Sequence, residues 1–94
     1  THVVDLIGVQ DHPYNGGFLE TWTLLATLGA ITSRVRLFPN VANLPLRPPA
    51  MLAKSAATLD ILTGGRVELG LGAGAFWDAV AGYGGPRRSG GEAV

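Results

Sequence analysis

Three short segments of the sequence carry residues whose types and spacing could do chemistry. Asp11 and His12 end an apolar run in VQDHPYNGG, residues 40–49 read NVANLPLRPP, and residues 70–74 read GLGAG. A histidine side chain has an unperturbed pKa of about 6.5, so it can act as a general base or donate a hydrogen bond. Glycine lets a ligand approach backbone N–H groups closely. These residue types indicate a small-molecule site with an acid–base group, in which Asp11 could set the tautomer of His12 or could itself face the bound molecule.

Each of these segments also has a purely structural interpretation. Asp11 and His12 could satisfy loop backbone groups before Pro13, and Arg47 could brace its loop instead of binding an anion. GLGAG lacks the third glycine of a dinucleotide-binding G-x-G-x-x-G turn, because AFWD follows it. His2 and His12 have no clustered partner ligands in the sequence, so we expect no metal site.

The elements that must position these residues follow an alternating pattern. Runs rich in β-forming residues cover 6–10, 35–39 and 67–71, and apolar helical stripes occupy 19–32 and 49–62. Pro49 suits the first helical turn, and Gly64-Gly65 suits a left-handed helix stop. Strand–helix alternation at this spacing predicts an α/β fold, a βαβαβ unit with a parallel sheet.

Strand parity predicts which side chains share a face. Ligands bind at the carboxyl ends of strands in parallel α/β architecture, where all three chemical segments fall. Val67, Leu69 and Leu71 should meet helices, while Glu68, Gly70 and Gly72 should face the ligand. By the same alternation Ile7 and Val9 should pack on helices, and His12 should point with Gln10 and Gly8 into the mouth of the sheet.

A second consequence of parity concerns two charges. Arg36 shares the ligand-facing side with Phe38 and Asn40, and Glu68 lies on the same side of the next strand. Buried charges are tolerated when they are paired, so we expect Arg36 and Glu68 to form an ion pair. Residues 75–94 show no sustained period and are predicted to form a loop, whose final GGEAV could open another helix.

The composition restricts the class of partner. The 94 residues have a formal net charge of zero and no cysteine, so neither nucleic acid, a membrane nor a disulfide framework is predicted. We expect a cytoplasmic protein with a small-molecule substrate. Hydrophobic residues make up 47% of the chain and charged residues only 15%, and a small parallel sheet has open edges, so a homo-oligomer is expected.

Longer segments carry a family resemblance. DHPY, then ETWTLLATLGAITSRVRL, then NLPLRPPAMLAKSAATLDILTGGRVELGLGAG resemble, in order and spacing, the luciferase-like flavin and deazaflavin (F-420) oxidoreductases. The resemblance covers nearly all of residues 5–74. It implies that residues 1–94 are the portion of a (β/α)8 TIM barrel from strand 2 to the start of helix 4, with F-420 or FMN bound noncovalently.

The resemblance also implies roles for individual residues. His12 matches the histidine beside the reactive face of the cofactor, with Asp11 as its orienting partner. Asn40, Val41 and Ala42 match the bulge after the third barrel strand, where a cis Asn40–Val41 peptide supports the cofactor ring. Gly72, Ala73 and Gly74 match the cofactor loop after the fourth strand. Ala75 stands where several relatives that act on sugar phosphates carry a glutamate proton donor, so that reaction is not expected.

The short length of the chain leads to two hypotheses about its function. A complete barrel needs about 250 residues, whereas this chain has 94. The first hypothesis is a flavin- or deazaflavin-dependent oxidoreductase of which the chain is a part. The second is a noncatalytic unit that folds by self-association.

Overall fold

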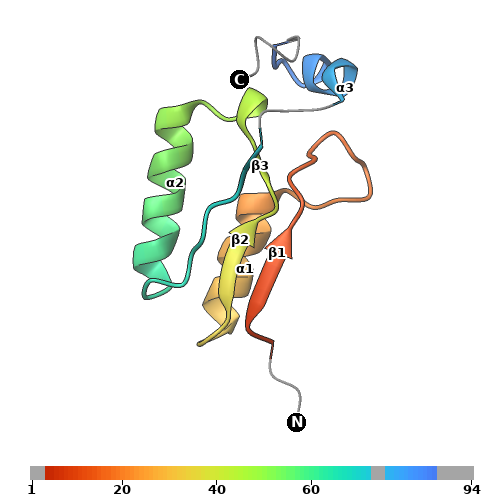
Figure 1. The fold of residues 1–94 in the computed structure, drawn as a ribbon. Helices are drawn as coiled ribbons and strands as arrows, with labels where there is room; N and C mark the ends of the chain where they lie inside the picture. The colour runs from red at the N-terminus through yellow and green to blue at the C-terminus, as the bar shows by residue number, and fades with distance from the viewer. Residues whose placement is uncertain (1–3, 73–75, 87–94) are drawn as a thin grey trace.

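The computed structural model describes residues 4–72 and 76–86 as an α/β unit in which all paired strands are parallel. This confirms the predicted fold class. The elements, in chain order, are β1 (Leu6–Val9), α1 (Thr21–Ile31), β2 (Arg36–Pro39), β3 (Ala42–Asn43), the 3-10 turn η1 (Leu44–Leu46), α2 (Pro49–Leu62), β4 (Leu71–Gly72) and α3 (Trp77–Gly82) (Figure 1).

The helices lie where the apolar periodicity predicted them. α2 begins at Pro49, whose missing N–H costs nothing in a first turn. It ends before Gly64 and Gly65, which have φ values of 69° and 84°, a left-handed conformation that glycine adopts without a Cβ penalty. α1 begins two residues after the predicted start, because Glu20 caps its first turn by accepting hydrogen bonds from the backbone N–H groups of Trp22 and Thr23.

The core lies between the two long helices and β2. Leu37 of β2 and Leu25 of α1 have no exposed surface, and Leu59 of α2 is buried against them. Ile7 and Val9 pack on this cluster, as strand parity predicted. Gly29 of α1 lets the elements approach closely, since a Cβ there would lie 2.7 Å from the Thr63 side chain. In Figure 1, α1 lies behind β1 and β2, and α2 lies beside them.

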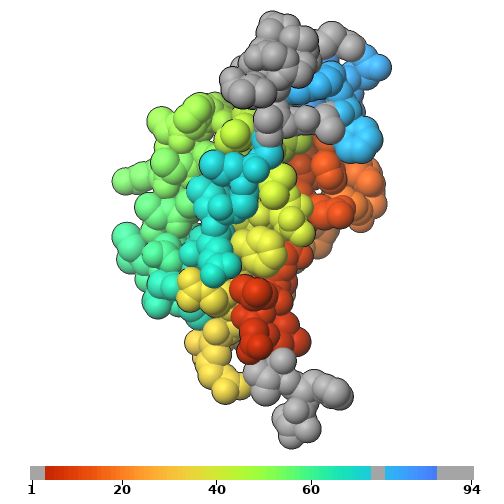
Figure 2. Space-filling view, in the orientation of Figure 1, coloured from red at the N-terminus to blue at the C-terminus, as the bar shows by residue number. Residues whose placement is uncertain are grey.

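The third predicted strand is interrupted. Val67 forms an isolated parallel bridge to Leu37, and regular pairing resumes where Leu71 and Gly72 pair with Ala42 and Asn43. The backbone N–H of Leu37 donates to this segment and its C=O accepts from it. In an extended strand the next residue whose backbone groups face the same neighbour is Pro39. Proline has no N–H to donate, so the ladder is broken there. Figure 2 shows the segment 66–72 (cyan) lying between α2 and the β2–β3 segment.

The prediction that one whole side of this segment meets helices was wrong. Val67 packs against the core, whereas Leu69 and Leu71 are 42% and 53% exposed. The core formed with α1 and α2 covers Val67. After Val67 the segment is no longer a regular strand, so Leu69 and Leu71 are not held against the helices. Parity therefore predicted the environment of the first residue and not that of the next two.

The prediction of a loop after residue 75 was also wrong in part, because Trp77–Gly82 forms α3. Six residues are too few to show a helical period. The helix instead depends on a tertiary contact, since its Val80 is completely buried and lies with Leu46 against Gly85. α3 lies at the same end of the molecule as the loop that follows β1 (Figure 1).

Candidate functional site

A buried carboxylate organises the carboxyl end of the sheet. The Asp11 side chain, which follows β1, has no exposed surface. Its Oδ2 accepts hydrogen bonds from Arg47 Nε at 2.6 Å and from the Asn43 backbone N–H at 2.7 Å, and its Oδ1 accepts one from Arg47 Nη2 at 2.7 Å. Such a two-pronged contact fixes both position and orientation. Asp11 therefore ties the loop after β1 to β3 and to the loop before α2.

Arg47 extends this network to the start of α1. Its Nη2 also donates to Glu20 Oε2 at 2.8 Å, and its guanidinium lies 6.0 Å from the centre of the Trp22 ring. Partial burial opposes ionisation of both groups. The contacts with Asp11 and Glu20 nevertheless raise the pKa of Arg47, and hydrogen bonds from Arg47, Thr23 and Trp22 lower the pKa of Glu20 to about 2. Arg47 thus braces its loop, the structural alternative considered for it.

His12 has a different partner from the one expected. Its Nδ1 lies 2.6 Å from the Tyr14 hydroxyl, while the neighbouring Asp11 carboxylate binds Arg47 and Asn43. The expectation that Asp11 orients His12 directly is therefore corrected: the buried carboxylate accepts hydrogen bonds from the Arg47 guanidinium and the Asn43 backbone N–H instead. His12 is partly buried and follows the carboxyl end of β1; that it points with Gln10 and Gly8 remains a prediction.

Aromatic rings from two distant segments surround His12. Its ring centre lies 5.5 Å from Tyr14, 6.3 Å from Phe18 and 5.7 Å from Phe76, which meets it edge-on. Tyr14 in turn contacts Tyr83, with ring centres 6.4 Å apart. Phe76 has a φ of 54°, an uncommon conformation for a residue with a side chain. These contacts, within the spacing typical of aromatic pairs, hold the start and the end of α3 against the loop after β1.

Tyr14 and Asn43 complete the polar part of this region. Burial raises the pKa of Tyr14; a hydrogen bond from the Asn43 side chain partly offsets this, and the charge of Asp11 raises it further. Asn43 Nδ2 donates to the Asp11 carbonyl at 3.3 Å. Its Oδ1 is buried and has no hydrogen-bond partner among the described residues. Unpaired buried acceptors are rare in folded proteins.

The predicted cofactor-contact residues lie at this same end. The Asn40–Val41 peptide bond is cis, as the resemblance implied. Asn40 is exposed and Val41 is 44% exposed, whereas Ala42 is fully buried and cannot present its side chain to a ligand. Gly72 pairs with Asn43, and a Cβ at Gly72 would meet the Val41 side chain. Ala73 and Gly74 lie outside the described residues. The contacts of Asn40, Val41 and Gly72 with a cofactor remain a prediction.

The predicted ion pair between Arg36 and Glu68 is confirmed. Arg36 Nε donates to Glu68 Oε1 at 2.9 Å, and the side chains are 47% and 50% exposed. On the same face, Phe38 covers Gly8, where a Cβ would lie 2.7 Å from the ring. This face of the sheet is therefore polar at its amino end and aromatic in the middle.

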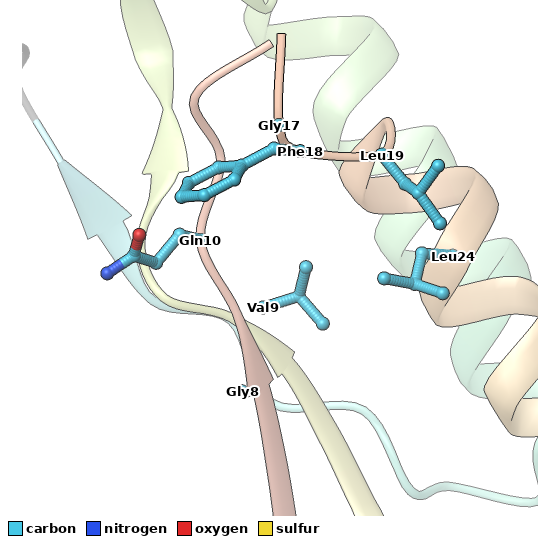
Figure 3. A pocket seen from close by; sticks show the side chains of 7 residues that line it. All are labelled: Gly8, Val9, Gln10, Gly17, Phe18, Leu19 and Leu24. Atoms are coloured by element: carbon cyan, nitrogen blue, oxygen red, sulfur yellow. The ribbon is translucent and has the colours of Figure 1, made fainter. Parts of the chain in front are cut away.

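An open, mainly apolar pocket of about 400 Å³ lies beside β1. Figure 3 shows its lining, from Gly8, Val9 and Gln10 of the strand end, Gly17, Phe18 and Leu19 of the following loop, and Leu24 of α1. Phe18 separates this pocket from His12, whose ring it contacts. The pocket thus adjoins the candidate site at the outer edge of β1.

Sequence reasoning missed several residues of the site. Tyr14 was part of the DHPY segment, but nothing in its spacing identified it as the partner of His12. Glu20 is not one of the preferred helix-capping residues. Phe76 lay in a segment predicted to be a loop, and Asn43 lay in the 40–49 segment but was not singled out there. Residues 4–72 and 76–86 contain no group of three or more His, Asp or Glu side chains that could hold a metal ion. No helix in these ranges is long and apolar enough to cross a bilayer.

Comparison with curated proteins shows similarity over part of the chain. An uncharacterized protein of Mycobacterium tuberculosis is 53% identical over 55 residues, which are 58% of this chain and 19% of that protein. The pyrimidine monooxygenase RutA of Escherichia coli is 47% identical over 53 residues, which are 56% of this chain and 14% of that enzyme. The chain therefore spans less than a fifth of these relatives.

Two solved structures share the fold. The coenzyme F420-dependent tetrahydromethanopterin reductase of Methanopyrus kandleri has a TM-score of 0.73 at 30% identity, covering 87% of this chain and 22% of its own. The oxygenating constituent of 3,6-diketocamphane monooxygenase from Pseudomonas putida, a type II Baeyer-Villiger monooxygenase in complex with FMN, has a TM-score of 0.74 at 27% identity, covering 85% and 22%. The family model described as luciferase-like monooxygenase matches residues 5–92. This chain belongs to the luciferase-like monooxygenase family.

Proposed function

We propose that this chain contributes to the cofactor site of a flavin- or deazaflavin-dependent oxidoreductase of the luciferase-like type. The cofactor would lie at the carboxyl ends of the parallel strands, with a small-molecule substrate beside it. The observation that carries the proposal is the environment of His12. This side chain is partly buried at the carboxyl end of β1, enclosed by aromatic rings, and no hydrogen bond reaches its Nε2 from the described residues.

The residues proposed to hold a flat ring lie around Val41. A Cβ at Gly70 or at Gly72 would meet the Val41 side chain, so these glycines let Val41 lie close to the backbone. Val41 remains partly exposed. Asn40, Val41 and Gly72 would hold the ring, and His12 would lie at its reactive edge. The bound cofactor supplies the hydride or oxygen chemistry, while the protein orients the ring and excludes water.

The two structural relatives differ in cofactor, so we propose either F420 or FMN as the cofactor of this chain. One relative is named for its dependence on F420 and the other contains FMN. The choice is made by titrating the chain with each cofactor separately and following cofactor fluorescence. We expect saturable binding of one of them with a micromolar Kd, which corresponds to about 8 kcal/mol. Arg34→Met, which changes an exposed residue of the α1–β2 connection, should bind equally well.

Turnover provides the second test. In a complete family member, replacing the histidine that corresponds to His12 with alanine should lower turnover much more than cofactor affinity. Equal losses in both would assign that histidine a scaffolding role only. Absence of saturable binding of either cofactor by a chain with native circular dichroism would overturn the proposal for this chain.

A noncatalytic, self-associating unit is the alternative, and exposed apolar side chains favour association in either case. Ile31, Ile61 and Leu62 are 74%, 79% and 76% exposed, although leucine and isoleucine are usually buried. We therefore propose that the protein is a homo-oligomer, and its net charge of zero fits a cytoplasmic protein that binds neither nucleic acid nor membranes. Sedimentation equilibrium giving a compact 9.8 kDa monomer would contradict association.

A further inference from the structure

We propose that Tyr14 is a positioning residue for His12: its hydroxyl donates a hydrogen bond to His12 Nδ1, so that neutral His12 carries its proton on Nε2. His12 then presents an N–H donor to the site instead of a basic lone pair. The inference concerns the chain without any ligand, so it stands whether or not the proposed cofactor binds. It decides between the two roles, base or donor, that residue type alone leaves open for a histidine.

A tight turn places the two side chains together. The backbone N–H of Asn15 donates to the His12 carbonyl at 3.0 Å, which closes a four-residue turn with Pro13 in its second position. Proline is favoured there because its ring sets the required φ in advance. His12 and Tyr14 are therefore held on a short rigid segment, and the distance from Nδ1 to the hydroxyl oxygen is 2.6 Å.

The surroundings of Tyr14 determine the direction of this hydrogen bond. Its ring contacts Phe76 and Tyr83, and this partial burial disfavours the phenolate. The hydroxyl therefore keeps its proton at neutral pH. Among the described residues, the polar atom within hydrogen-bond distance of this hydroxyl is His12 Nδ1, at 2.6 Å, so we infer that the Tyr14 proton is directed to Nδ1. The other ring nitrogen must then carry the proton of the neutral imidazole.

Asp11 supports this arrangement indirectly. Its carboxylate holds Arg47 and the backbone of Asn43, and the Asp11 carbonyl accepts from Asn43 Nδ2. These contacts fix the position of Asn43, whose side chain acts on the pKa of Tyr14. The Tyr14 hydroxyl itself lies at His12 Nδ1, where we infer that it sets the histidine tautomer.

Nitrogen-15 NMR of the full chain tests the proposal directly. The two histidines are distinguished with a His2→Gln variant. We expect neutral His12 to show the proton on Nε2, and the Tyr14 hydroxyl proton to show scalar coupling to Nδ1 across the hydrogen bond at low temperature. A proton bonded directly to Nδ1 in the native chain would overturn the proposal.

Tyr14→Phe and Tyr83→Phe form a matched pair of variants. Each removes one hydroxyl from the same aromatic cluster, but only Tyr14 bonds His12. Tyr14→Phe should abolish the coupling and increase the population of the Nδ1–H tautomer several-fold, whereas Tyr83→Phe should leave both unchanged. Equal tautomer populations in the wild type and Tyr14→Phe would overturn the positioning role. The wild-type measurement alone decides the direction of the bond should Tyr14→Phe fail to fold.

Discussion

Two arginines organise opposite ends of the α/β unit, and they do so with different chemistry. Arg66, at the amino end, donates within the described residues to neutral oxygens: the carbonyls of Gly29, Thr32, Val35 and Thr63 and the Thr32 hydroxyl. Arg47, at the carboxyl end, donates to the carboxylates of Asp11 and Glu20. One end is thus joined by neutral hydrogen bonds and the other by ion pairs.

The difference separates the scaffold from the site. Arg66 satisfies carbonyls at the ends of α1 and α2, where a positive charge is also favoured by the helix dipole. None of its partners titrates. Arg47 instead neutralises a carboxylate that has no exposed surface, and such a pair is costly to break because one buried charge is left alone. The loop that carries His12 therefore depends on electrostatics.

The largest expected effect comes from breaking the carboxyl-end pair. Arg47→Met should lower the free energy of unfolding by about 3–5 kcal/mol, because Asp11 is left buried without its cation. Urea denaturation measures the change. The double variant Asp11→Asn with Arg47→Met should recover part of the loss, since the uncompensated charge is gone. A loss under about 1 kcal/mol in the single variant would mean that water replaces the guanidinium.

Breaking the amino-end cluster should cost less. Arg66→Met should lower the free energy of unfolding by about 2–3 kcal/mol, because several partly buried carbonyls lose a donor but no buried charge is created. Arg34→Met, at an exposed position nearby, is the control and should stay within about 0.5 kcal/mol of the wild type. A loss for Arg66→Met larger than that for Arg47→Met would reverse the proposed distinction.

Acid should distinguish the two ends further. The pKa of Glu20 is lowered to about 2 from its usual 4.5, so its contribution to stability is complete above pH 4.5 and is lost as the pH falls toward 2. The stability difference between the wild type and Glu20→Gln should therefore be constant above pH 4.5 and shrink below it. Protonation of Glu20 over the same pH range should not change the difference in unfolding free energy between the wild type and Arg66→Met. Urea denaturation between pH 3 and pH 7 measures both differences. If the stability losses of Glu20→Gln and of Arg66→Met shrink in parallel as the pH falls, the two ends do not differ in the proposed way.

The exposed ion pair should have the smallest effect. Arg36 and Glu68 form a good contact, but about half of each side chain is exposed. Glu68→Gln should change the free energy of unfolding by less than about 1 kcal/mol, because water screens the pair. Added salt should reduce even this difference. A larger, salt-independent loss would indicate that the pair is covered in solution, as an oligomer would do.

Local pattern was sufficient for much of the scaffold. The two long helices, the Pro49 start and the Gly64-Gly65 stop of α2 follow from apolar periodicity and from backbone preferences of single residues. The parallel order follows from strand–helix alternation, and the Arg36–Glu68 pair from counting along two adjacent strands. Each of these inferences uses either the residue pattern of a single helix or strand, or the regular alternation of side chains along two neighbouring strands.

Other features depend on contacts between distant segments. Pro39 interrupts the ladder to residues 66–72 only because that segment is its neighbour in the fold. α3 forms where Val80 finds a buried position, which six residues cannot signal. Residue type and resemblance marked Asp11 and His12 as a pair, but the tertiary structure separates their roles. Arg47, 36 positions away, reaches the Asp11 carboxylate, and a proline turn brings Tyr14 to His12. Side-chain partners are set by distance in space, which the spacing of residues along a chain does not determine.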